Sequence, residues 1–252
     1  MNCRKSFSLL ELVFVILIVS IFATFFLKID DKKGIEVAKT QFMRHIRYTQ
    51  HLAMVDEKVA LQTESELRQK FPFKSYWQIQ LASTSETSTI YNKKLLYYSI
   101  YSDTPTRTRF NFDIKADEVA IDPHSQKYLN GLWTELFKNS STGAKYKIEN
   151  LTETSMNLSL EYGIEKVRFK YGTNPKIFEN KLNLFFDEFG RPYLFPTSNG
   201  ITLSAFAKSE EPHPYKHILK DIVEIELSKN GEKICFQIHQ FSGYLTDSIC
   251  NF

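Results

Sequence analysis

Residues 7–27 read FSLLELVFVILIVSIFATFFL, and this stretch decides what the rest of the chain can be. It contains 21 residues, of which 17 are apolar, and a helix of that length spans roughly 30 Å at ~1.5 Å per residue. That length matches the hydrocarbon core of a bilayer, so the sequence predicts a membrane-spanning helix. A cleaved secretory signal is the alternative, but it needs a shorter apolar core and a small-x-small site, which Ala23-Thr24-Phe25 is not.

One acidic residue, Glu11, interrupts the apolar run four residues after its first member. A carboxylate at the centre of a membrane costs about 2.5 to 3.5 kcal/mol and less near an interface, so Glu11 needs water or a counter-charge. Two interpretations follow. Either Glu11 lies near the cytoplasmic headgroups and is hydrated there, or a cation from another subunit pairs with it.

The residues around this acid carry a family resemblance. Residues 4–13, RKSFSLLELV, followed by unbroken apolar sequence, resemble the class III leader of type IV pilins and pseudopilins. The resemblance implies that prepilin peptidase cuts between Ser6 and Phe7 and that the new amine of Phe7 is methylated. It also implies that Glu11 pairs with the Phe7 amine of a neighbouring subunit, which would fix the register of assembly. Ser6 stands where the family prefers Gly, although it is still a small residue.

The resemblance and the patterns after the apolar run together predict an α+β fold, in which a long N-terminal helix with a membrane-spanning first half packs on an antiparallel β-sheet domain, as in pilins. The expected division is a leader at 1–6, a transmembrane helix at 7–27, a periplasmic continuation of the helix at 28–64 and a periplasmic β-rich globular domain at 65–252.

The predicted helix carries one apolar stripe and one basic face as far as about Val59. The stripe residues recur at intervals of 3, 4, 4 and 7, which indicates one helical face that packs on a sheet. They are Ile35, Ala38, Phe42, Ile46 and Ala53. The other face carries Lys39, Arg44, Arg47 and Lys58, which we interpret as a solvated surface. Gly34 lies between the two helical stretches and favours a kink there.

Short aromatic or β-branched runs, mostly alternating, follow the helix and predict strands. They cover 76–81, 94–101, 108–114, 156–162, 167–171 and 181–186. A second, short helix is predicted over 128–138, although Gly131 weakens it. Near the end, residues 222–227 and 232–238 flank Ser228-Lys229-Asn230-Gly231, and Asn-Gly between alternating runs predicts a β-hairpin.

The three cysteines divide between the leader and the last segment. Cys3 would leave with the leader, whereas Cys235 and Cys250 remain 15 positions apart. A disulfide between them would contribute about 3 kcal/mol by the chain-entropy estimate in an oxidising periplasm, and several pilins close their C-terminal region with such a bond. We therefore predict a Cys235–Cys250 disulfide, with two separate buried thiols as the alternative.

The sequence offers little enzyme chemistry. A formal charge of +3 falls short of what a nucleic-acid coat needs, so no direct nucleic-acid binding is expected. His213 and His217 are four residues apart, but Pro212 and Pro214 on either side of His213 prevent the helix that would aim both at one zinc. The acidic residues Asp113, Asp117, Glu118 and Asp122 lack the spacing of a calcium loop and favour a solvated turn. With no catalytic motif, we expect no enzyme, no cofactor and no metal.

A fainter likeness appears in the last third. Residues 186–192, FDEFGRP, and 241–245, FSGYL, look like the C-terminal half of the H-class minor pseudopilins of type II secretion, although residues 190–192 also suit an ordinary turn. The resemblance implies a single-pass inner-membrane subunit that assembles into a periplasmic pseudopilus or pilus for type II secretion. Its partners would be prepilin peptidase, other pilins or pseudopilins, the inner-membrane assembly platform and membrane lipid. The alternatives are a minor pilin of a type IV pilus or DNA-uptake system, and a single-span anchored periplasmic binding protein.

Overall fold

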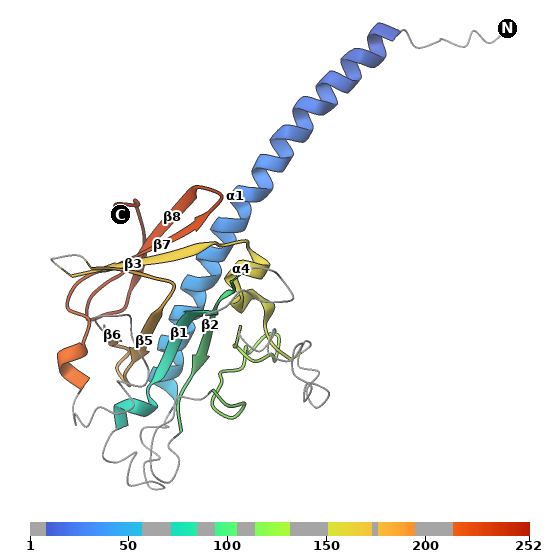
Figure 1. The fold of residues 1–252 in the computed structure, drawn as a ribbon. Helices are drawn as coiled ribbons and strands as arrows, with labels where there is room; N and C mark the ends of the chain where they lie inside the picture. Colours follow the sequence, from blue (N-terminus) through green and yellow to red (C-terminus); the bar gives the residue numbers. More distant parts are fainter. Residues whose placement is uncertain are drawn as a thin grey trace.

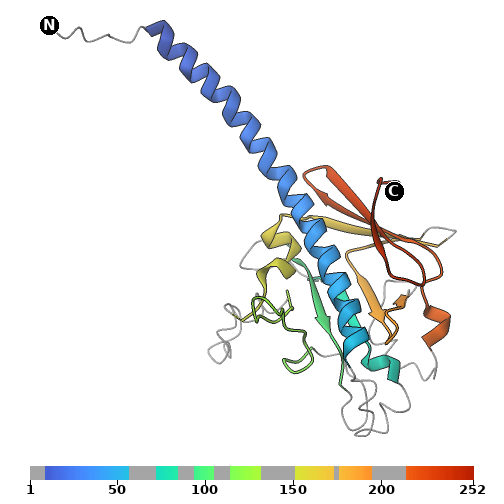
Figure 2. The same cartoon turned by 180° about the vertical axis from the view of Figure 1, so that it is seen from behind.

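A computed structural model describes residues 9–56, 72–84, 94–104, 114–131, 151–172, 176–194 and 214–252. Its longest element is helix α1, Leu9–Val55, whose second half lies along the body of the protein while the first half projects away from it (Figures 1 and 2). The helix runs through Gly34 without a break in its helical assignment. It ends at Val55, ahead of the predicted Val59.

The body that follows the helix is predominantly β and contains two antiparallel sheets. The four-stranded sheet has the order β2-β1-β5-β6 and the five-stranded sheet the order β4-β3-β7-β8-β9. The strands of the first are β1 (Trp77–Ser83), β2 (Leu96–Tyr101), β5 (Leu182–Phe186) and β6 (Pro192–Leu194). Those of the second are β3 (Lys166–Tyr171), β4 (Lys176–Glu179), β7 (Val223–Lys229), β8 (Glu232–Ile238) and β9 (Leu245–Ser248).

The predicted fold class is wrong. We expected one helix packed on one antiparallel sheet in the pilin manner, whereas the described chain has nine strands in two sheets behind the helix. The physical reason is that apolar side chains of both sheets share one core with the helix, including Tyr98 and Leu184 from the first sheet and Ile225 and Phe236 from the second. Strand alternation predicts which face of a strand is buried but not which sheet the strand joins.

The membrane-spanning helix predicted over 7–27 is also wrong, because no helix in the described residues is long and apolar enough to cross a membrane. The apolar side chains described at the start of α1 run from Leu9 to Phe22. The single-pass inner-membrane location with a periplasmic domain, which rested on that span, is corrected with it.

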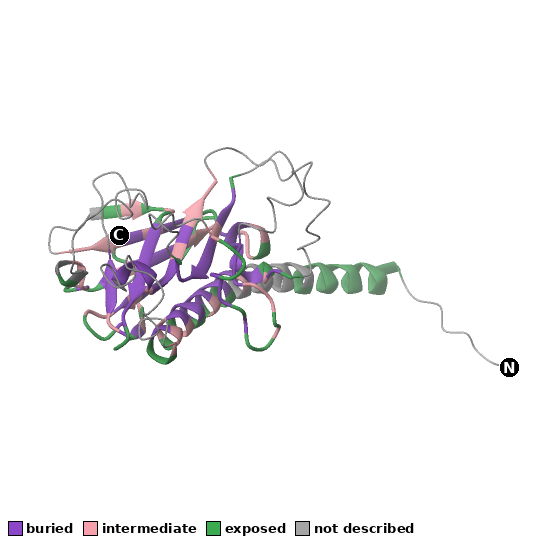
Figure 3. Ribbon diagram, turned by 90° about the horizontal axis from the view of Figure 1, so that it is seen from below, coloured by how far each residue is buried: buried purple, intermediate pink, exposed green. Residues whose placement is uncertain are grey.

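The helix stripe is confirmed. All five predicted stripe residues are buried, and they pack against strands of both sheets. Phe42 is the clearest case, because its ring lies 4.8 Å from the ring of Tyr98 on β2 and 5.9 Å from that of Phe236 on β8. One side chain of the helix thereby joins the two sheets. Figure 3 shows purple, buried residues on the part of the helix that lies along the body and green, exposed residues on its outer end.

The predicted terminal hairpin is confirmed as β7 and β8. Lys229 pairs with Glu232, and the two residues between them, Asn230 and Gly231, both have positive φ angles of 50° and 79°. Two consecutive positive φ angles define the tight turn that Asn-Gly favours between antiparallel strands. The predicted runs at 76–81, 94–101, 167–171 and 181–186 correspond to β1, β2, β3 and β5.

The strand predicted over 156–162 is wrong. This segment forms a 3₁₀ turn η6 (Thr154–Met156) and one turn of helix, α4 (Leu158–Glu161). Asn157 is the cause, because its side-chain oxygen accepts the backbone N–H of Leu160 at 3.1 Å and caps the turn. Two further 3₁₀ turns are η3 (Pro72–Ser75) and η7 (Pro214–His217). Residues 108–113 of one predicted strand and 132–138 of the predicted second helix lie outside the described residues.

The junction at Phe42 generates a stability prediction. Phe42→Ala should lower the free energy of unfolding by about 3 to 5 kcal/mol, because the truncation leaves a cavity between two sheets and the helix. The matched control is Val37→Ala on the same helix, where the side chain is 50% exposed and the change should stay within about 0.5 kcal/mol. Urea unfolding of both variants measures the difference. Equal stabilities for the two variants would contradict the role of Phe42.

Candidate assembly surface

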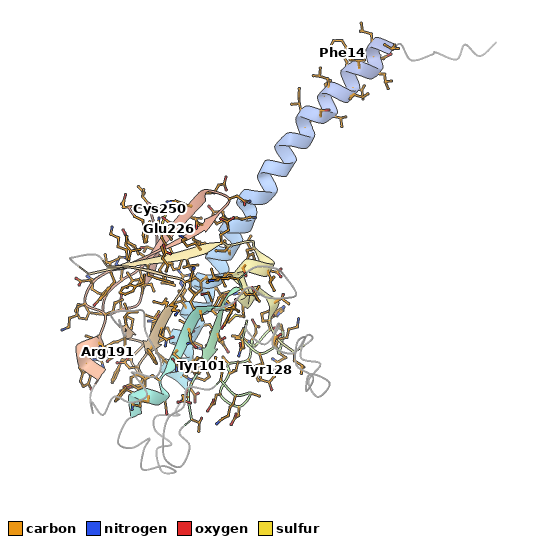
Figure 4. All side chains as sticks on the ribbon, viewed as in Figure 1. Phe14, Tyr101, Tyr128, Arg191, Glu226 and Cys250 are labelled. Carbon is orange, nitrogen blue, oxygen red and sulfur yellow. A yellow bond between two sulfur atoms is a disulfide. The ribbon has the colours of Figure 1, made fainter. Side chains whose placement is uncertain are left out.

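The start of α1, from Leu9 to Phe22, is an apolar surface that no other described residue covers. From Leu9 to Phe22 every large apolar side chain is exposed, with exposed fractions between 48 and 82%. We call this segment, Leu9–Phe22, the apolar rod. Figure 4 shows Phe14 on the rod, far from the labelled residues of the body. A continuous apolar surface of this kind on a folded chain marks a site of interaction.

Local chemistry supports the helical form of the rod. The rod has one described hydroxyl group, that of Ser20. This hydroxyl donates a hydrogen bond to the carbonyl oxygen of Ile16 at 2.7 Å, so it has its partner within the same helix. Glu11 lies in the first turn of α1, where the positive end of the helix dipole favours a carboxylate. The rod therefore holds one acidic group close to its tip. The predicted cleavage-site residues, Ser6 and Phe7, lie outside the described residues.

Polar contacts, as well as the apolar core, hold the second half of α1 against the body. Lys39 is nearly buried, and its Nζ lies 3.0 Å from Asp247 of β9 and 3.5 Å from Glu36. The prediction of a solvated Lys39 is therefore wrong, because the edge of the second sheet covers it. Arg44 and Arg47 are exposed as predicted, and Lys58 lies outside the described residues.

Near the end of α1, Gln50 ties the helix to two turns. Its Nε2 donates to the carbonyl oxygens of Gly190 at 2.7 Å and of Ser242 at 2.8 Å. Both turns need glycine at the contact, because Gly190 and Gly243 have φ angles of +74° and +66°. A Cβ on Gly243 would also lie 3.0 Å from Gln50 Nε2. These bonds join the helix to the β5–β6 and β8–β9 connections.

The β5–β6 turn belongs to the motif 186–192. The buried carboxylate of Asp187 accepts bonds from Arg191 Nε at 2.6 Å, from the Tyr193 hydroxyl at 3.0 Å and from the backbone N–H of Phe189 at 3.0 Å. Figure 4 labels Arg191 at this corner of the body. The motif is thus a structural turn, and these contacts show no catalytic arrangement in it.

A buried histidine lies at the centre of the helix contact. His45 Nδ1 lies 2.7 Å from the hydroxyl of Tyr98. Burial lowers the pKa of His45 to about 4, with a further lowering from Arg44 and a smaller opposing effect of Asp122. His45 is therefore neutral at pH 7. Burial also raises the pKa of the Tyr98 hydroxyl well above its usual range.

The predicted disulfide is confirmed, since Cys235 and Cys250 are bonded with their Cα atoms 5.2 Å apart. The carboxylate of Glu226 lies next to them, as Figure 4 shows, and these three residues are the one metal-like grouping among the described residues. Both sulfur atoms are engaged in the disulfide. Glu226 forms a bidentate pair with Arg168, at 2.8 and 2.7 Å. The grouping is therefore structural, because the disulfide joins the C-terminal segment to β8.

The other candidate metal residues do not come together in the described part of the chain. Glu118 is fully buried, and its two carboxylate oxygens accept the backbone N–H groups of Thr104 and Lys115. Asp122 instead caps its own turn through the backbone of His124. His217 lies in η7, whereas Asp113 and His213 lie outside the described residues. The prediction of a solvated acidic turn is wrong for Glu118 and Asp122, which are both buried.

Sequence reasoning missed the polar residues that hold the helix, namely Lys39, His45 and Gln50. Periodicity identified only the apolar stripe, and a basic or amide side chain on a helix usually faces water. The available signal was spacing, because Lys39, His45 and Gln50 each follow a stripe residue by three or four positions. Residues at that spacing are neighbours on a helix surface and therefore border its buried face.

No family model matches this chain, and neither a curated protein nor a solved structure matches it. The resemblance carried by residues 4–13 therefore stays a prediction from the sequence.

The buried imidazole predicts a pH dependence. The pKa of His45 is 6.5 when unperturbed and about 4 in the fold, so the unfolded chain binds the proton more readily. The fold should therefore lose stability as the pH falls from 6.5 to about 4, by roughly 3 kcal/mol from this one group.

Urea unfolding at several pH values measures this effect. His45→Gln should flatten the slope between pH 6.5 and 4, whereas His51→Gln, which changes an exposed histidine of the same helix, should leave it unchanged. An identical slope in His45→Gln and in the native chain would contradict the assignment.

Proposed function

We propose that this chain is a minor pilin-like structural subunit, processed by prepilin peptidase and assembled through its N-terminal helix into a pseudopilus or pilus that serves type II protein secretion. The observation that carries the proposal is the apolar rod, which is exposed on all sides and projects from the body (Figures 1 and 2). A surface of this kind is stable in water only when other apolar surfaces cover it.

In this proposal, the N-terminal helices of neighbouring subunits cover the apolar rod. A rod with apolar side chains all round can pack on several helices at once, as a helix in the centre of a bundle does. The body would then lie outside the bundle, attached through the stretch of α1 that begins at Ile35. Because the same helix forms the rod and the core of the body, the rod cannot swing independently.

In this proposal, Glu11 fixes the axial register between neighbouring helices. In a bundle of apolar rods, sliding one helix along another changes the buried area little, so apolar contacts alone fix the axial position weakly. A carboxylate near the tip of each rod, paired with the Phe7 amine of a neighbour, favours one axial position because a mispaired charge is costly in an apolar surrounding. The pairing rests on the resemblance of residues 4–13 and on the position of Glu11 in the first turn.

The first test is processing. In cells with prepilin peptidase, intact-mass measurement and N-terminal sequencing should give a chain that begins at methylated Phe7, and cells without the peptidase should give the uncut chain. Ser6→Gly restores the residue that the family prefers and should be cut at least as completely. A Met1 terminus in both strains would overturn the proposal.

The second test is assembly. Glu11→Ala should leave the amount of folded subunit unchanged but reduce its cross-linking into filaments at least about tenfold, since losing a charge pair costs more than about 1.4 kcal/mol. Ser20→Ala is the matched control, because the Ser20 hydroxyl is satisfied within its own helix. Native cross-linking of Glu11→Ala would refute the pairing role.

A deletion strain then identifies the system served. Loss of protein secretion with DNA uptake intact supports the proposed secretion role. Loss of transformation with secretion intact would overturn that role and assign the subunit to a DNA-uptake pilus.

A further inference from the structure

A cavity of about 360 Å³ lies beside α1, on the part of the helix that belongs to the body. Arg44, His45 and Tyr48 line it from the helix, and the turn that begins at Asp122 lines it from the opposite side together with Glu153. Its volume is at the low end of the roughly 300 to 1,000 Å³ typical of ligand sites, so it suits a small molecule. The proposed assembly function makes no use of it.

The walls of the cavity are held by hydrogen bonds. The Tyr48 hydroxyl donates to the carbonyl oxygen of Ile121 at 2.9 Å, which ties the helix to the turn. Asp122 Oδ1 accepts the backbone N–H groups of His124 and Ser125 at 2.7 and 3.1 Å. The Ser125 hydroxyl then donates to Glu153 Oε2 at 3.0 Å. The site is therefore formed before any ligand arrives.

The described charged groups that line this cavity form no ion-pair contacts with one another. Within the described residues, Arg44 makes no ion pair and no side-chain hydrogen bond, although two carboxylates line the same space. Asp122 and Glu153 each use a single carboxylate oxygen, and Asp122 Oδ2 and Glu153 Oε1 have no partner in the described chain. The guanidinium group thus lies on the helix wall while acceptors remain available across the cavity.

The protonation states at neutral pH follow from the surroundings. Burial acts to raise the pKa of Asp122, but the N–H groups of Ser125 and His124 and the nearby His45 and Arg44 outweigh it, so the pKa is lowered and Asp122 is ionised. His45 is neutral for the reasons given above. The cavity therefore presents one guanidinium group, two carboxylates and a neutral imidazole.

We propose that this cavity binds a small zwitterion of the α-amino acid class, with the ligand carboxylate on Arg44 and the ligand ammonium group between Asp122 and Glu153. A plain anion would pair with Arg44 but face two carboxylates. A plain cation would suit the carboxylates but leave the guanidinium group without a partner. A molecule that carries both charges pairs with all three groups, and guanidinium–carboxylate contacts are among the stronger hydrogen-bonded pairs in proteins.

Binding assays on the wild-type chain give the first test. The full chain, purified in detergent because the apolar rod is exposed, is titrated by calorimetry with each of the common L-amino acids in turn. At least one should bind with a dissociation constant below about 1 mM. Its N-acetyl derivative, which lacks the ammonium group, and its amide, which lacks the carboxylate, should each bind at least about tenfold more weakly, as expected for the loss of one charged contact.

Variants then assign the contacts. Arg44→Gln and Glu153→Gln should each weaken binding about tenfold or more, with the N-acetyl derivative insensitive to Glu153→Gln. The matched control is Arg47→Gln, which removes an exposed arginine of the same helix that does not line the cavity. Thermal melting of each variant verifies the fold, and the comparison of derivatives on the native chain needs no variant at all.

Three results would overturn the proposal. The first is that no amino acid binds. The second is that the amide binds as well as its parent amino acid, which would mean that the cavity accepts a simple cation such as the lysine side chain of a partner protein. The third is native affinity in Arg44→Gln.

Discussion

The whole arrangement depends on the contact of one helical stripe with two sheets at once. Phe42 touches Tyr98 of the four-stranded sheet and Phe236 of the five-stranded sheet, so the helix is the common wall of both. Neither sheet has another long helix to cover its inner face among the described residues. Burial of apolar surface is the dominant favourable term in folding, and α1 contributes to the core that both sheets share. The direction of the projecting rod follows, because the rod is the same helix continued.

Polar contacts at the edges of the stripe set the rotation and axial position of the helix. Apolar contacts are non-directional and tolerate small rotations of a helix, whereas hydrogen bonds require defined geometry. The bonds of His45 to Tyr98 and of Gln50 to the Gly190 and Ser242 carbonyls supply that geometry. The ion pair of Lys39 with Asp247 adds a third point.

Different segments and faces of α1 have different roles. The apolar rod is exposed, the stripe that begins at Ile35 packs in the core, and Arg44 and Tyr48 line the cavity. At 3.6 residues per turn, Phe42 and Arg44 point about 160° apart, so one can be buried while the other is exposed. The cavity and the core therefore coexist on one turn of helix without competing for side chains.

The sequence by itself determined the elements whose causes are local. The spacing of apolar residues predicted the stripe of α1, Asn230-Gly231 predicted the terminal hairpin, and the aromatic and apolar run at 181–186 predicted the strand observed as β5. The Cys235–Cys250 pair was expected from number and spacing, and the exposed rod is visible as a run of apolar letters.

Only the tertiary structure decided the rest, because the deciding contacts join residues far apart in the chain. The division of strands between two sheets depends on pairings such as β1 with β5 and β3 with β7, which alternation does not specify. Lys39 is buried because Asp247 reaches it, and His45 because Tyr98 covers it. The cavity exists because a turn near residue 122 meets a helix face near residue 44, and no pattern within either segment encodes the distance between them.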